Sequence, residues 1–126
     1  MKLEFLSDES SVCPLIRLYD FTPAEAAQLL AAVTALADLR AQRVAIHELP
    51  GVEPVGGCRL TLRVRSWDQG VTLRTAPADF EYGLIAGTWD NVAGLVAPFT
   101  ESAGGFQWLD NASSEVRLLL SPDGSW

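Results

Sequence analysis

Histidine is almost absent from this chain, and its scarcity removes a whole class of sites. His47 is the only histidine among the 126 residues, so metal sites that need two histidines, such as the H-E-x-x-H motif, are excluded. The two cysteines, Cys13 and Cys58, lie far apart and form no C-x-x-C pair, which removes the common zinc and redox motifs. We therefore expect no bound metal and no other cofactor.

Motifs that hold phosphates or activate a serine are also missing. The sequence contains neither G-x-G-x-x-G nor G-x-x-x-x-G-K-[ST], and it contains no G-x-S-x-G. A cysteine nucleophile could still be built from Cys13 or Cys58 with His47 and a carboxylate such as Asp20 or Glu48. Neither cysteine lies in a recognised local signature. We therefore name no catalytic residue and favour a protein that is not an enzyme.

Long apolar runs and positive charge are both in short supply. No segment approaches the roughly 18 consecutive apolar residues that a membrane-spanning helix needs, and residues 1–11 lack the apolar stretch of a signal peptide. The formal net charge is −7, which disfavours nucleic acid and anionic membrane surfaces as partners. Together with the unpaired cysteines, these absences favour a cytoplasmic location with reduced thiols.

What the chain does contain is typical of one globular domain. Its length and its apolar content of 48 % allow a single core, so residues 1–126 are treated as one domain. The patterning predicts an α+β fold: an antiparallel or mixed sheet of about six to eight strands with two helices packed on one face. The predicted order is β-β-α-β-β-β-β-α-β-β, with strands over residues 3–6, 13–21, 43–49, 58–66, 71–75, 79–86, 106–110 and 115–120.

The clearest local signal is a helix start. The Thr22 hydroxyl can cap the first turn, Pro23 fits the first helical position, and Glu25 can close a capping box. Apolar residues then recur at helical spacing. The predicted helix runs from Pro23 to about Leu39, with Leu29, Val33 and Leu36 buried and with Gln28 and Asp38 exposed.

A second helix is expected to begin at Thr88 and to end or kink at Pro98. Its first residues align with the first helix without gaps, so that Thr22 matches Thr88 and Leu29 matches Leu95. Each predicted helix follows a strand and precedes at least two more. A βαββ internal duplication is therefore a hypothesis that the sequence supports.

The most distinctive pattern is a row of arginines. Residues 58–66 alternate between apolar and basic side chains, and a hairpin with residues 71–75 would bring four arginines to one surface. That surface could bind a carboxylate or a phosphate. Alternatively, Asp79 and Glu81 in the next strand could neutralise it through ordinary salt bridges. Trp67, in the turn between the strands, could stack on a ligand or anchor an interface. The candidate ligand-binding residues are Arg59, Arg63, Arg65, Arg74 and Trp67.

Three functions remain open on these observations. The lack of a catalytic constellation favours a non-catalytic binding or protein-interaction domain. The alternatives are a small-molecule enzyme with its site in a sheet concavity, and a regulatory module that binds a small anion on the arginine-rich face. Residues 13–21 and 115–120 are apolar on both sides, and two helices cannot cover both faces of a sheet. We therefore expect a homodimer or another protein partner.

Overall fold

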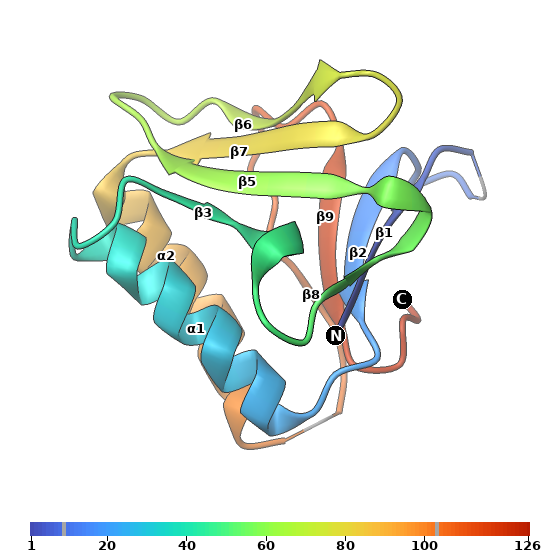
Figure 1. The fold of residues 1–126 in the computed structure, drawn as a ribbon, viewed down its shortest axis with the longest axis horizontal. Helices are drawn as coiled ribbons and strands as arrows, with labels where there is room; N and C mark the ends of the chain where they lie inside the picture. The colour runs from blue at the N-terminus through green and yellow to red at the C-terminus, as the bar shows by residue number, and fades with distance from the viewer. Residues whose placement is uncertain (9, 103) are drawn as a thin grey trace.

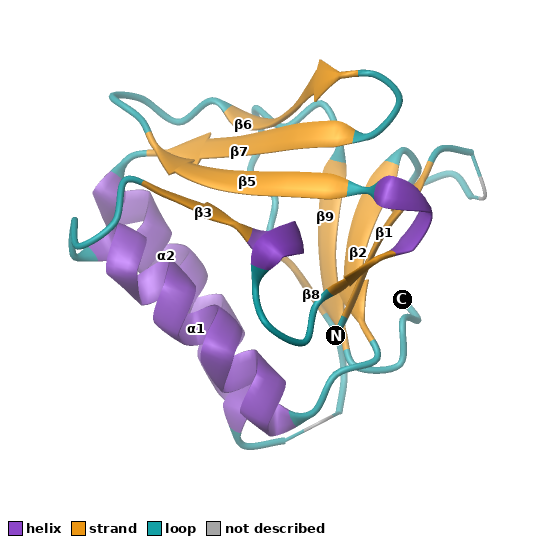
Figure 2. Ribbon diagram, in the orientation of Figure 1, coloured by secondary structure: helices purple, strands orange, loops and turns teal. Residues whose placement is uncertain are grey.

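The computed structural model describes residues 1–8, 10–102 and 104–126. Two β-sheets and a pair of α-helices form three sides of the molecule and enclose the core (Figures 1 and 2). The class is α+β, as predicted, but the nine strands of the described residues divide between two mixed sheets where we expected one.

The strands are β1 (Lys2–Leu6), β2 (Leu15–Tyr19), β3 (Arg43–Ala45), β4 (Glu53–Pro54), β5 (Arg59–Val64), β6 (Gly70–Thr75), β7 (Asp79–Leu84), β8 (Gln107–Trp108) and β9 (Arg117–Ser121). The helices are α1 (Pro23–Ala37) and α2 (Ala86–Val96), with short 3-10 helices η1 (Ile46–Glu48), η2 (Val55–Gly57) and η3 (Ala97–Thr100).

Helix α1 has the start and the buried side that its sequence predicts. The Thr22 hydroxyl accepts a hydrogen bond from the Glu25 backbone N–H at 3.3 Å, and the Glu25 carboxylate accepts one from the Thr22 N–H at 3.0 Å. This capping box satisfies N–H groups that a helix start leaves without partners. Leu29, Val33 and Leu36 are 3 %, 1 % and 0 % exposed, whereas Gln28 and Asp38 are exposed. The prediction for this helix is confirmed.

The five-stranded sheet has the order β4-β1-β2-β9-β8, and the four-stranded sheet has the order β3-β5-β7-β6. Each contains a central parallel pair, β2 with β9 or β5 with β7. Antiparallel neighbours flank both pairs. The central position of β2 agrees with its apolar character on both faces, since Leu15, Ile16 and Leu18 are all buried.

The expected hairpin between residues 58–66 and 71–75 is wrong. Strand β5 pairs with β3 and β7, and β6 lies on the far side of β7. The reason is visible in β7, which is buried over its whole length except at its first residue, Asp79, and so takes an interior place. Its Glu81 then lies between arginines of β5 and β6, whereas direct pairing of those two strands would set like charges side by side.

Helix α2 begins at Ala86, not at Thr88, and Ile85 is its N-cap residue. Asp68, in the loop between β5 and β6, explains the earlier start. Its carboxylate accepts hydrogen bonds from the Ile85 N–H at 3.0 Å and from the Thr88 hydroxyl at 2.9 Å. A cap supplied by a distant loop leaves no local signal in the sequence, and for that reason the sequence alone predicts the hydroxyl of Thr88 as the cap.

Several predicted strands are shorter in the structure. The strand expected over residues 43–49 ends at Ala45 and continues as η1. The segment 50–57, which lies between two predicted strands, contains the two residues of β4, which pair with β1, and then η2. Strand β8 keeps only two residues of the stretch 106–110. Strand existence was therefore predicted better than strand length.

The two halves of the chain repeat one order of elements. The series β1-β2-α1-β3-β5 matches β6-β7-α2-β8-β9, with β4 as an addition. The buried residues of α1 match those of α2 and η3 at one constant separation, in the pairs Ala26/Trp89, Leu29/Val92, Val33/Val96 and Leu36/Phe99. The predicted register is wrong, because it sets buried Leu29 against Leu95, which is 37 % exposed. Each sheet combines strands from both halves.

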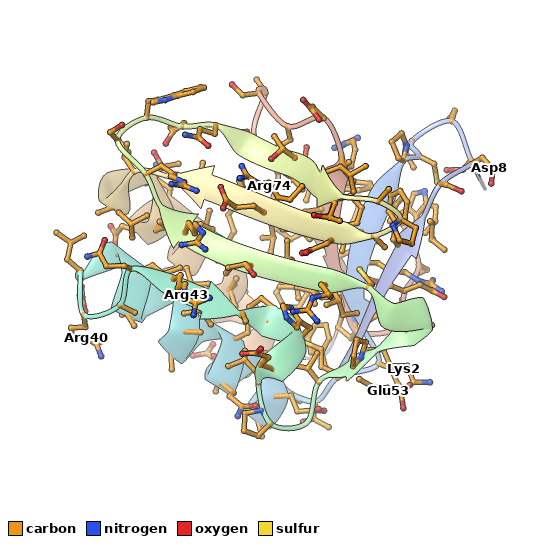
Figure 3. All side chains as sticks on the ribbon, turned by 45° about the horizontal axis from the view of Figure 1, so that its top comes forward. Lys2, Asp8, Arg40, Arg43, Glu53 and Arg74 are labelled. Carbon is orange, nitrogen blue, oxygen red and sulfur yellow. The ribbon has the colours of Figure 1, made fainter. Side chains whose placement is uncertain are left out.

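The outer faces of the two sheets differ in what covers them. On the five-stranded sheet, Leu6, Leu15 and Leu119 form a small buried apolar cluster. Val12, Cys13 and Trp108 of the same chain pack against this cluster. The Gly124 carbonyl also accepts a hydrogen bond from Arg17 at 3.0 Å, which holds the C-terminal residues to this sheet. No described helix or strand lies over the outer face of the four-stranded sheet, which Figure 3 brings forward. That face is exposed at Arg43, Arg59 and Arg74.

Candidate functional site

Five arginines and two acids collect on the outer face of the four-stranded sheet. We call this set the arginine face; it consists of Arg43 from β3, Arg59 and Arg63 from β5, Arg65 just after β5, Arg74 from β6, and Asp79 and Glu81 from β7. Figure 3 labels Arg43 and Arg74 on this side of the molecule. The face holds five of the nine basic side chains of the chain and only two of its sixteen acids. Its charge is therefore opposite in sign to that of the whole chain.

Strand alternation and register place these side chains together. Leu60 and Leu62 of β5 are 0 % and 4 % exposed on the inner side, so Arg59 and Arg63, which flank them in the alternating strand, point outward, as predicted. Arg43 is the Cα partner of Arg63 across β3 and β5. Sequence reasoning missed Arg43, because its membership depends on a pairing between strands that are separated by η1, β4 and η2. Its only signal was a basic residue at the start of a predicted strand.

Glu81 lies at the centre of the arginine face, with its side chain only 6 % exposed. Arg65 donates to its carboxylate from Nε at 3.2 Å and from Nη2 at 2.9 Å, in the two-pronged geometry that suits a guanidinium and a carboxylate. Arg63 Nε lies 2.8 Å from Glu81 Oε1, and Arg74 Nη1 lies 3.9 Å from Oε2. Three of the predicted arginines therefore converge on one acid, although through a strand order that was not predicted.

The absence of a side chain at Gly83 allows Arg65 to reach Glu81. A Cβ atom at Gly83 would lie 2.8 Å from Arg65 Cγ and 3.3 Å from Gln69 Oε1. Gly83 follows Glu81 on the same side of β7, so the stem of Arg65 crosses the sheet over bare backbone. Arg65 is consequently held in one place by both its stem and its guanidinium group.

The remaining arginines are much less engaged. Within the described residues, Arg43 and Arg59 form no ion pair, and Arg74 makes no hydrogen bond with an acid. The Nε atom of Arg63 is buried, and its N–H is not aligned for a hydrogen bond despite the short distance to Glu81. Guanidinium groups with free donors are the usual means by which proteins bind carboxylates and phosphates. The open donors lie mainly on Arg43, Arg59 and Arg74.

A hollow of about 180 Å³ lies between β5 and β6, over β7. Thr61, Arg63 and Arg74 form part of its lining, and Asp79 and Glu81 add negative charge. Trp67, the remaining predicted residue, follows Arg65 in the loop to β6 and is 61 % exposed. Trp67 is therefore an exposed aromatic residue two positions after Arg65 in the chain, and it does not line the hollow.

Comparison of the chain with protein-family models, with curated proteins and with solved structures finds no match. The geometry of the arginine face therefore carries the functional assignment. None of the described helices is long and apolar enough to cross a membrane. In the same described part of the chain, no three histidine, cysteine, aspartate or glutamate side chains are grouped so that they could hold a metal ion.

Two of the residues considered for nucleophilic chemistry, Cys58 and His47, have structural roles. Cys58 is 1 % exposed, and burial, aided by Glu4 and Asp79, raises the pKa of its thiol to about 12. That direction is opposite to the one that activates a cysteine. His47 Nδ1 accepts a hydrogen bond from the Leu60 N–H at 3.1 Å, which ties η1 to β5.

The described core between the sheets and the helices leaves little free volume. The cavity between the sheets and the helices holds only about 10 Å³ and is lined by apolar and aromatic side chains. The polar atoms of its two polar aromatic residues are used within the fold. The Tyr82 hydroxyl donates to the Leu109 carbonyl at 2.6 Å, and Trp89 Nε1 donates to the Arg63 carbonyl at 2.9 Å. This cavity lends no support to the alternative of an enzyme site.

Proposed function

We propose that this chain is a non-catalytic binding domain that recognises an acidic segment of a protein partner with its arginine face. The observation that carries the proposal is the gathering of five arginines on the uncovered face of a sheet in a chain of net charge −7. On the corresponding face of the five-stranded sheet, a small apolar cluster and the C-terminal residues pack against the strands. A basic surface in an otherwise acidic molecule attracts and orients acidic partners.

The composition of the face supports a protein partner in particular. Arginine and tryptophan are the residues that contribute most often to the binding energy of interfaces. Trp67, two residues after Arg65 in the chain and 61 % exposed, offers an apolar side chain to a partner. The net charge of the whole chain opposes a long polyanion such as nucleic acid, which would extend beyond the basic face. The two cysteines are unbonded, which supports a reducing, cytoplasmic location for the interaction.

The test uses a short polyglutamate peptide with a fluorescent label as the acidic probe. Fluorescence anisotropy compares the intact chain with the triple variant Arg43→Gln, Arg59→Gln, Arg74→Gln, which removes the three least engaged guanidinium groups. At about 0.2–1 kcal/mol for each exposed pair, we expect affinity to fall about ten-fold. Binding to the intact chain should also weaken as salt is added, because exposed charges are screened.

The matched control is Arg40→Gln. Arg40 is an exposed arginine after α1 that pairs with Asp38 and lies outside the arginine face. This variant loses the same kind of charge and should bind the probe nearly as the intact chain does. Equal affinity of the intact chain and the triple variant would contradict the proposal.

A small anionic ligand is the second candidate, and the hollow between Arg63 and Arg74 is the observation that favours it. Such a ligand would gain the donors of both arginines, although Asp79 and Glu81 would oppose it. A thermal-shift screen with pyrophosphate and citrate tests this candidate, because a ligand that binds the folded state raises the melting temperature. A shift that survives in Arg74→Gln would place the ligand elsewhere.

A further inference from the structure

We propose that Glu81 limits the affinity of the arginine face, because it holds within the chain the guanidinium groups that an acidic partner would otherwise bind. The inference deepens the proposed function and rests on it. It assigns Glu81 a regulatory part in binding, in addition to its place in the sheet.

The geometry shows a carboxylate that already occupies the centre of the face. The Glu81 carboxylate accepts hydrogen bonds from Nε and Nη2 of Arg65. Its oxygens also lie 2.8 Å from Arg63 Nε and 3.9 Å from Arg74 Nη1. A carboxylate from a partner would compete for the same donors. It would also meet the negative charge of Glu81, since like charges at close range repel each other.

The three arginines are not equally available to a partner. Arg65 is fixed by its two-pronged contact and by its close fit over Gly83, where a Cβ atom would lie 2.8 Å from its Cγ. Arg74 is 56 % exposed and lies beyond hydrogen-bonding distance from Glu81. Arg74 should therefore turn to an incoming carboxylate first, and Arg63 next, while Arg65 remains with Glu81.

A purely structural role for Glu81 predicts a different result. If Glu81 only held the arginines in place, its neutralisation would let them spread apart, and binding would weaken or stay the same. If Glu81 competes with the partner, its neutralisation frees Arg63 and Arg74 and removes a repulsive charge, so binding strengthens. The sign of the change in affinity separates the two roles.

The experiment measures binding of the same labelled polyglutamate peptide to Glu81→Gln. We expect the affinity of Glu81→Gln to be about two- to five-fold higher than that of the intact chain. One or two exposed ion pairs between the freed arginines and the peptide would contribute about this much. Glu53→Gln is the control for net charge. Glu53 is an exposed acid of β4 on the other sheet, far from Arg74 in Figure 3. The gain in Glu81→Gln should exceed any gain in Glu53→Gln.

A second comparison covers the case in which Glu81→Gln does not fold. Removing a buried acid leaves its arginines uncompensated and is often strongly destabilising. The variant Arg65→Gln with Glu81→Gln removes both partners of the tightest contact, and near-UV circular dichroism checks that it folds. It should bind the probe more tightly than Arg65→Gln alone.

The outcomes distinguish the two proposals. If neutralising Glu81 leaves affinity unchanged or lowers it in both comparisons, while the triple arginine variant still loses binding, Glu81 is only structural and the arginine face still binds acids. If the intact chain and the triple variant bind the probe equally or not at all, the proposed function itself falls, and the role of Glu81 falls with it.

Discussion

Glu25 joins the start of helix α1 to the beginning of the chain. One carboxylate oxygen closes the capping box with Thr22, and the other binds the N-terminal ammonium of Met1. That ammonium group also donates to the Gly51 carbonyl at 3.0 Å. The N-terminal ammonium and the Thr22 N–H together lower the pKa of Glu25 from its ordinary value of 4.5. The negative charge of Glu25 therefore ties the start of α1 to Met1, and the Met1 ammonium in turn reaches the loop at Gly51.

The charge of Glu25 predicts a pH dependence of stability. Its folded-state pKa is lowered, so its contribution is present above pH 4.5 and is lost as the pH falls through the folded-state value. Glu25→Gln should reduce the free energy of unfolding at neutral pH, and the difference from the intact chain should shrink as the solution is acidified. Urea unfolding at several pH values measures this.

Glutamine can still close a capping box, so Glu25→Gln isolates the charge from the cap. Glu53→Gln serves as a second reference, because Glu53 forms no ion pair among the described residues. A difference between Glu25→Gln and the intact chain that stays constant between neutral and acidic pH would contradict the assigned role.

At the scale of elements, the two helices show two ways of starting. Helix α1 carries its own cap in Thr22 and Glu25, so its first residue follows from the local sequence. Helix α2 has no cap of its own and depends on Asp68 of the loop between β5 and β6. The buried sides of both helices nevertheless follow from apolar spacing, because burial repeats with the helical period.

We predict a clear order of costs within α1. Thr22→Ala should cost about 1 kcal/mol, through loss of the side-chain cap. Leu29→Ala should cost about 2–5 kcal/mol, because Leu29 is 3 % exposed and its loss leaves a cavity. Gln28→Ala, at an exposed position beside Leu29, should stay within about 0.5 kcal/mol of the intact chain. Urea melts of the three variants give the order, and a larger cost for Thr22→Ala than for Leu29→Ala would refute it.

At the scale of the whole molecule, the chain separates its charges between surfaces. The arginine face gathers most of the positive charge on one sheet, and the rest of the surface is strongly acidic. The apolar outer residues of β2 and β9, which suggested a dimer, are covered by the chain's own Val12, Cys13 and Trp108. A second copy would have to bind elsewhere, because two arginine faces repel each other.

Self-association at micromolar concentration remains a prediction. Leu39, Leu95 and Phe106 are 57 %, 37 % and 47 % exposed, and a partner copy that covered them would bury apolar surface. Sedimentation equilibrium should show species heavier than 13.6 kDa. The triple arginine variant should associate to the same extent, because the arginine face is not the expected contact. A single species at 13.6 kDa would contradict the prediction.

Features that depend only on neighbouring residues could be predicted from the amino-acid sequence. These are the start of α1, the buried side of that helix, and the alternation that sends Arg59 and Arg63 outward from β5. The position of β7 between β5 and β6, and the sharing of Glu81 by Arg63 of β5 and Arg74 of β6, follow instead from the three-dimensional packing of the strands. Strand order depends on hydrogen bonds and burial between segments far apart in the chain, and no local pattern of side chains encodes which strands will pair.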